Sequence, residues 1–122
     1  MSNYIYMTED TPKTITAEYY VFKAGYSKHP QYRGGQMRQA ARRAGVVGDV
    51  EMKIEHHIVN LYTEDKALTH FVEGYILGKI TSLPSVERFS REFFFINWQD
   101  REYCYQHLAE WVNEAMTLWG EG

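Results

Sequence analysis

Three kinds of side chain in this sequence are suited to phosphodiester chemistry. Glu73 lies on the shoulder of an apolar helix face, where a carboxylate can bind a divalent cation through its oxygen atoms. Arg33 lies in the first or second turn of another predicted helix. There its guanidinium can form a bidentate contact with a phosphate and offset the charge that develops in the transition state. Taken alone, each residue is more readily read as an ordinary charged group on a solvated helix.

The third kind is the phenol. Tyr6, Tyr26 and Tyr32 can orient or deprotonate a water only if a metal or cation lowers a pKa of about 10. The chain has 10 tyrosines, so we expect most of them to pack. The 5 histidines form no metal motif: His56 and His57 are adjacent in a predicted strand and therefore point to opposite faces. Satisfied or solvent-facing imidazoles are the expectation.

Positive charge is concentrated in one stretch. The formal net charge is -3, yet no acidic residue occurs between positions 23 and 43, which carry +6 and leave -9 on the rest. The six basic residues are Lys23, Lys28, Arg33, Arg38, Arg42 and Arg43. This pattern is typical of a phosphate-facing patch that binds nucleic acid, although a solvated basic helix face explains it equally well.

The composition indicates one folded domain spanning residues 1–122. Hydrophobic residues make up 44% and aromatic residues 16%, enough for a core without disulfides. Cys104 is the single cysteine, which excludes an internal bridge and a multi-thiolate zinc site, and we expect it to fill the core of a protein in a reducing compartment. No leader or membrane span is recognisable, so we predict a cytoplasmic protein with no membrane partner.

Hydrophobic periodicity predicts an α+β fold: a small three-stranded antiparallel sheet flanked by helices, with an extra C-terminal helix. The predicted strands span residues 3–7, 16–24 and 50–59, with a turn region at 8–13, and 92–97 reads as a short buried strand or an extended segment. The predicted helices span 30–44, 63–80 and 100–119. Gly25 is expected to end the second strand, and Thr63 to cap the second helix.

Two helices have apolar faces that should meet the core. The first face consists of Leu68, Phe71, Val72, Tyr75 and Ile76. The second consists of Leu108, Trp111, Val112, Ala115, Leu118 and Trp119.

The order of the motifs resembles the GIY-YIG nuclease superfamily, and most closely the short-form members found in phage and bacterial open reading frames. Tyr4-Ile5-Tyr6 stands on the first strand, Lys23-Ala24-Gly25 closes the second, Arg33 follows that glycine by eight residues and Glu73 lies on a later helix. Arg91-Glu92-Phe93-Phe94 is similar to the acidic-aromatic segment of those members. The resemblance covers most of residues 3–95.

The resemblance implies an active site of Tyr6, Arg33 and Glu73, with assistance from Tyr26. It implies that Glu73 holds one Mg²⁺ or Mn²⁺ on the scissile phosphate, that Arg33 steadies the phosphate and that Tyr6 positions or activates the water. The sequence departs from the family at three positions: Tyr4 replaces the first glycine, Lys23 replaces the second tyrosine and Met37 replaces a histidine or tyrosine. The identity of the general base therefore stays open.

Two functions follow from these expectations. The first is a metal-dependent DNA endonuclease whose specificity requires a protein partner, a homodimer or the basic helix, because no separate DNA-targeting module fits in the chain. The alternative is a catalytically weak or inactive binding protein on the same scaffold, such as a phage factor that engages nucleic acid or inhibits a host protein complex.

Overall fold

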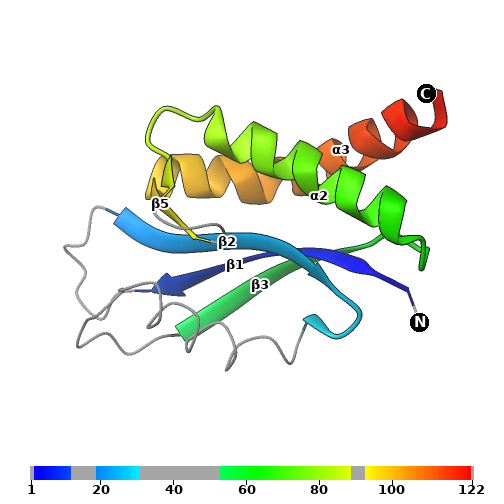
Figure 1. Cartoon of the computed structure of the whole chain (residues 1–122). Helices are drawn as coiled ribbons and strands as arrows, with labels where there is room; N and C mark the ends of the chain where they lie inside the picture. Colours follow the sequence, from blue (N-terminus) through cyan, green and yellow to red (C-terminus); the bar gives the residue numbers. More distant parts are fainter. Residues whose placement is uncertain (1, 12–18, 31–52, 89–92, 122) are drawn as a thin grey trace.

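The computed structural model describes residues 2–11, 19–30, 53–88 and 93–121 and has an α+β architecture. Its sheet has five antiparallel strands in the order β3-β1-β2-β5-β4, and helices α2 and α3 lie together over one face (Figure 1). The elements are β1 (Tyr4–Thr11), β2 (Tyr19–Ser27), β3 (Lys53–Asn60), α2 (Lys66–Thr81), β4 (Glu87–Arg88), β5 (Phe94–Asn97) and α3 (Trp98–Glu121).

The predicted α+β class and the antiparallel sheet are confirmed, but the sheet has five strands rather than three. β5 pairs with the first half of β2, and the two-residue β4 pairs with β5. The segment 92–97 was predicted as a strand without a place in the sheet. Its run of phenylalanines lacks the alternation that would reveal a pairing edge, so only the tertiary structure assigns its neighbour.

Two strand ends differ from the prediction because pairing overrides local turn signals. β1 continues to Thr11 although residues 8–11 read as turn, since Thr8 pairs with Lys23 on one side and His56 on the other. Gly25 does not end β2, which runs on to Ser27. The predicted helix at 30–44 lies almost wholly outside the described residues.

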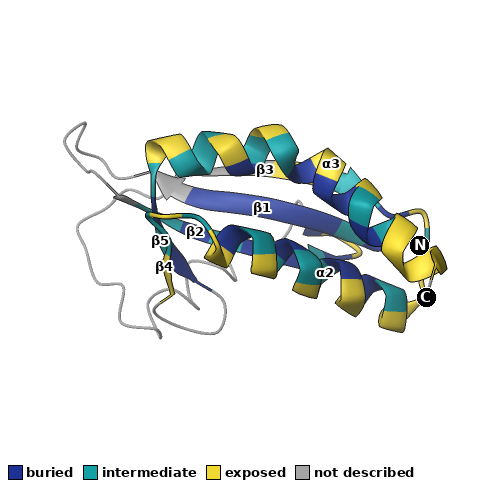
Figure 2. Cartoon of the chain, turned by 90° about the horizontal axis from the view of Figure 1, so that it is seen from above, coloured by how far each residue is buried: buried dark blue, intermediate teal, exposed yellow. Residues whose placement is uncertain are grey.

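Alternation along β1 divides the sheet into two faces. Ile5 and Met7 point toward the helices and belong to the main hydrophobic core, whereas Tyr6 and Thr8 point to the opposite face. The buried core residues that α2 and α3 contribute are Val72, Ile76, Ile80, Cys104, Leu108, Trp111, Val112 and Ala115. Figure 2 shows the exposed sides of both helices turned away from the sheet.

Asp65, and not the predicted Thr63, caps α2. Its Oδ1 accepts hydrogen bonds from the backbone N–H groups of Ala67 (2.9 Å) and Leu68 (3.2 Å). The helix start is also tied to β1, because Nδ2 of buried Asn3 donates to Oγ1 of Thr69 at 3.0 Å. These bonds set the rotation of α2 over the sheet.

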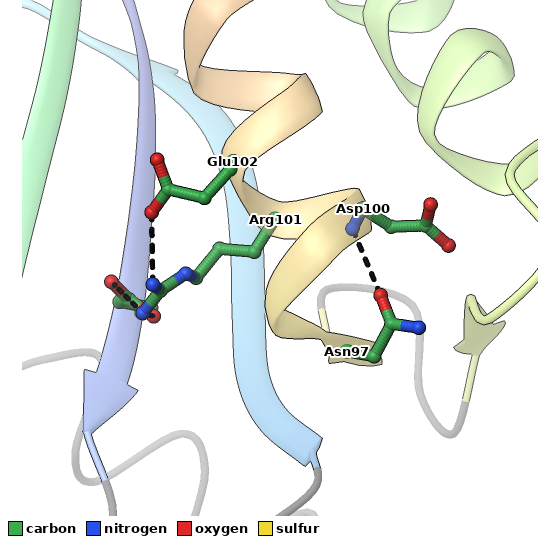
Figure 3. A network of polar contacts seen from close by, with 5 residues as sticks. Asn97, Asp100, Arg101 and Glu102 are labelled. Atoms are coloured by element: carbon green, nitrogen blue, oxygen red, sulfur yellow. Dashed lines mark hydrogen bonds and ion pairs between the residues drawn. The ribbon is translucent and has the colours of Figure 1, made fainter.

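Helix α3 begins at Trp98, two residues before the predicted start, because Oδ1 of Asn97 accepts from the backbone N–H of Asp100 at 2.8 Å (Figure 3). The predicted apolar face is confirmed through Ala115, but Leu118 and Trp119 are exposed where the C-terminal end of α3 rises away from the sheet (Figure 1). Phe71 on α2 is likewise exposed. In the described ranges, no helix is both long and apolar enough to cross a membrane.

A buried ion pair joins β1 to the first turn of α3. Glu9 is 1% exposed, and Nη1 of Arg101 donates to its Oε1 at 3.0 Å and its Oε2 at 2.9 Å. Figure 3 shows Arg101 reaching from α3 toward β1, with Nη2 also bonded to Glu102 at 2.9 Å. The guanidinium lies 4.2 Å from the centroid of the Tyr20 ring. The fold therefore depends on Arg101 to neutralise a carboxylate that is removed from water.

We predict that Arg101→Met lowers the free energy of unfolding by about 3–5 kcal/mol, because it removes the guanidinium that forms a bidentate pair with the buried Glu9 carboxylate. The double variant Glu9→Leu/Arg101→Met should recover most of that loss. Urea denaturation of the three proteins measures both effects. Lys28→Met is the matched control: it breaks an exposed pair with Glu64, so a loss below about 1 kcal/mol is expected. Equal losses at positions 28 and 101 would contradict the assignment.

We also predict that Cys104 is unreactive in the native protein. Burial raises the pKa of its thiol to about 12, with a further contribution from the negative charge of Asp100. The nucleophilic thiolate is therefore scarce at pH 8. Ellman's reagent should label the chain only after denaturant is added, and stoichiometric labelling of the folded protein would show that the thiol is accessible.

Candidate functional site

The C-terminal half of β2 pairs with a described strand on one side and not on the other. β1 pairs with β2 through Ser27, whereas β5 pairs with it only from Tyr19 to Phe22. Tyr26 lies in this open half and, because it pairs with the core residue Ile5, it points to the face that carries the helices. The start of α2 passes over it.

Tyr26 and His70 form a direct contact between β2 and α2. The phenol oxygen lies 3.3 Å from Nε2 of His70, and the rings meet edge to face with centroids 5.1 Å apart. Which atom donates depends on the histidine tautomer. The pair is solvent-exposed, so a substrate can approach it. A phenol hydrogen-bonded to an imidazole can pass a proton to or from a bound water.

Glu73 lies on the same flank of α2 as His70. The helix turns by about 100° per residue, so side chains three positions apart are separated by about 60° and are neighbours on the helix surface. The buried residues of α2 are Thr69, Val72, Ile76 and Ile80. The centre of this buried stripe lies closer to Glu73 than the centre of the predicted apolar face does, and Glu73 is accordingly half-buried. The opposite flank of α2, with Tyr75 and Lys79, contacts α3.

A positive charge stands beside this flank. Lys28 follows β2 directly, and its Nζ lies 3.9 Å from Oε1 of Glu64, just before α2. Both side chains are exposed, and such a pair contributes little to stability. Lys28 can therefore exchange this partner for a phosphate oxygen at small cost.

Tyr6 is separated from Glu73 by the sheet. It is 2% exposed, it pairs with Gly25 and Ile58, and it points to the face opposite α2. The structure thus does not bring Tyr6 and Glu73 together on one face. Lys23 lies on the same face as Tyr6, with its Nζ 5.8 Å from the centroid of the Phe93 ring.

The remaining predicted residues fall outside the described part of the chain. They are Arg33, Arg38, Arg42 and Arg43, together with Tyr32 and Met37. Four of the six basic residues predicted to face phosphate therefore have no described position, and only Lys23 and Lys28 can be placed. These two do not share a face, since Lys28 lies beyond the pairing of β2 beside Glu64.

The described side chains do not form a preformed metal cage. Among them, no group of three or more His, Cys, Asp or Glu residues is placed to hold an ion. Mg²⁺ commonly retains several waters and takes only one or two carboxylates, with the rest of its coordination from phosphate oxygens. Glu73 on an accessible flank can supply one such carboxylate.

Sequence reasoning missed His70, which it grouped with the unassigned histidines. A usable signal was present: His70 and Glu73 are separated by three positions on a predicted helix, which puts both on one flank. Nothing in the sequence pairs His70 with Tyr26, because that contact spans 44 positions. His57 fits the expectation of a satisfied imidazole, since its ring stacks on Tyr105 at 3.8 Å.

Comparisons of this chain with protein-family models, with curated proteins and with solved structures found no match. The GIY-YIG resemblance therefore stays an expectation based on residue order.

We predict that Gly25→Ala destabilises the fold by about 1–3 kcal/mol, because the added Cβ would lie 3.0 Å from Oη and 3.2 Å from Cζ of Tyr6. The variant Tyr6→Leu should cost stability alone by leaving a cavity, yet reduce the further cost of Gly25→Ala by giving the new methyl space. Thermal unfolding of both single variants and the double variant measures this coupling. Strictly additive losses would contradict direct contact between the two positions.

Proposed function

We propose that this protein is a metal-dependent endonuclease that hydrolyses phosphodiester bonds in DNA on a GIY-YIG-like scaffold. The single observation that carries the proposal is the Tyr26–His70 contact on the flank of α2 that also bears Glu73. In this proposal the contact acts as a proton-transfer pair, Glu73 supplies a carboxylate from the same flank, and the exposed pair lies next to the open half of β2. These are the groups that a metal-assisted hydrolysis needs.

Each residue has a distinct role in this proposal. Glu73 binds Mg²⁺ or Mn²⁺, which when bound supplies positive charge to the scissile phosphate. The Nε2–H group of His70 donates to the Tyr26 phenol oxygen and is oriented by that bond, so that the unprotonated Nδ1 of His70 accepts the proton of the attacking water. Lys28 contacts a flanking phosphate at the end of β2.

The basic residues of the sequence extend this interaction. Arg33 steadies the phosphate as the family resemblance implies, and Arg38, Arg42 and Arg43 add positive charge for the DNA backbone. Tyr6 takes a different part from the one that the resemblance implies: it is buried against Gly25 and supports the β1–β2 pair rather than touching water.

The test is nicking of supercoiled plasmid by purified protein with Mg²⁺ or Mn²⁺. We expect His70→Gln to lower the rate by roughly 100-fold or more, as loss of a general base does. Glu73→Gln should lower it at least as far and should weaken the response to Mn²⁺, while EDTA should abolish cutting. His107→Gln and Glu87→Gln are matched controls, because they make the same changes on α3 and on β4, away from this flank.

Two results would contradict the proposal: no cutting by folded wild type with either metal, or cutting that persists in both Glu73→Gln and His70→Gln. Loss of activity in Arg33→Ala alone would indicate a site elsewhere on the chain. Circular dichroism of every variant separates loss of chemistry from loss of fold.

The second candidate function is a binding protein without catalysis, such as a phage factor that engages nucleic acid or blocks a host protein complex. Its specific support is that Tyr6 is buried on the face of the sheet opposite Glu73. Two residues of the active site that the resemblance implies therefore lie on different faces. Salt-dependent DNA binding by fluorescence anisotropy, without nicking, is the result expected for this function.

A further inference from the structure

Helices α2 and α3 form an outer groove on the side of α2 away from His70. Six residues line it: Tyr75, Glu110, Asn113, Glu114, Thr117 and Leu118. The groove is open to solvent and has a volume of about 730 Å³. The two helices run antiparallel, since Phe71 meets Trp119 at one end of the contact and Lys79 meets Glu114 further along.

One end of the groove exposes apolar side chains. Leu118 is 47% exposed, Trp119 is 41% exposed and Phe71 is 38% exposed. The rings of Phe71 and Trp119 contact each other with centroids 5.4 Å apart, so they form one continuous apolar surface. Large apolar groups gathered next to a polar groove are typical of protein interaction sites.

The ridge of α2 beside the groove has no side chains at two positions. Gly74 and Gly78 are one turn apart and exposed, and a Cβ on either would meet nothing within 4 Å. Glycine inside a helix costs about 1 kcal/mol relative to alanine, and no neighbouring described atom requires it here. The bare ridge lets the backbone of another element approach closely.

The groove already binds one cation from its own chain. Nζ of Lys79 lies 3.8 Å from Oε2 of Glu114 and 5.3 Å from the centroid of the Tyr75 ring. The Tyr75 phenol donates to the same carboxylate at 2.6 Å, a bond that raises the pKa of Tyr75 and keeps it protonated. A carboxylate beside an aromatic face is a recognition site for ammonium or guanidinium.

The charge of α3 favours a basic partner. From Glu102 to Glu121 the helix carries four glutamates and no lysine or arginine. Two of them, Glu110 and Glu114, line the groove, where Lys79 offsets part of their charge. An approaching element with positive side chains gains from this field, and an acidic one is repelled.

We propose that the α2–α3 groove is a docking site for an amphipathic helix of a partner protein, with apolar residues on one face and lysine or arginine beside them. The apolar residues cover Phe71, Leu118 and Trp119, and the basic residues reach Glu110 and the Tyr75–Glu114 pair. The helix backbone lies along Gly74 and Gly78. This site uses none of Tyr26, His70 and Glu73, so either proposal can fail without the other.

The probe is a synthetic amphipathic peptide of leucine and lysine, roughly 18 residues and about 27 Å long as a helix, comparable to α2. A peptide with glutamate in place of lysine is the charge-reversed control. Binding is followed by anisotropy of the labelled peptide and by fluorescence of Trp119, with Trp119→Phe identifying its signal. We expect the lysine peptide to bind and the glutamate peptide to bind at least tenfold more weakly.

Two variants locate the site. Glu110→Lys reverses a groove charge, and Gly78→Leu fills the bare ridge while favouring the helix, so both should fold and should weaken the lysine peptide at least tenfold. Their matched controls are Glu87→Lys on β4 and Ala109→Leu on the other flank of α3, which should bind as wild type. Equal losses in variants and controls would reduce the binding to general charge attraction and overturn the proposal.

Self-association gives the other decisive outcome. Light scattering after size exclusion reports whether the chain forms a dimer. A dimer that Gly78→Leu disrupts would mean that a second copy, and not a basic helix, occupies the groove, which would also overturn the proposal.

Discussion

Burial of the Glu9 carboxylate constrains the rest of the described fold. A charge buried near the end of β1 is stable without water only if a cation reaches it, and Arg101 does so from the first turn of α3. That contact fixes the start of α3 over β1 and β2. The chain enters this turn directly from β5, so the same ion pair holds β5 beside β2 and sets the direction in which α3 crosses the sheet. This arrangement also fixes the position of α2, because the buried side chains of α2 pack against both the sheet and α3.

Helix α2 separates two surfaces of different chemistry. Its flank over β2 presents His70 and Glu73 to the open half of that strand, while its flank toward α3 presents Tyr75 and Lys79 to an acidic helix. The hydrogen bonds of Asp65 and Asn3 to the first turn set the rotation of α2 and therefore control both flanks together. A catalytic role for one surface and a docking role for the other are compatible, since no residue argued for one is used by the other.

Gly25 illustrates how a motif residue can be explained by packing alone. A methyl group at this position would press against the Tyr6 ring, so the glycine allows a large aromatic side chain to lie flat over the neighbouring strand. The same pair of residues supports the GIY-YIG resemblance in the sequence. Its presence is therefore consistent with a structural requirement of the β1–β2 hairpin as well as with an active site, and the position of Tyr6 opposite Glu73 favours the structural one.

Local sequence patterns determined the α+β class, the three strands β1, β2 and β3, and helices α2 and α3, because alternation and helical spacing report which side of an element is buried. They also determined Glu73 as the carboxylate on an accessible helix flank. Only the tertiary structure decided that β4 and β5 extend the sheet, that Leu118 and Trp119 stay exposed, and that Arg101 forms an ion pair with Glu9. It also decided that His70 contacts Tyr26, and that Tyr6 points to the face of the sheet opposite the helices. Each of these depends on which distant segments become neighbours, and the periodicity of one segment carries no information about its partner.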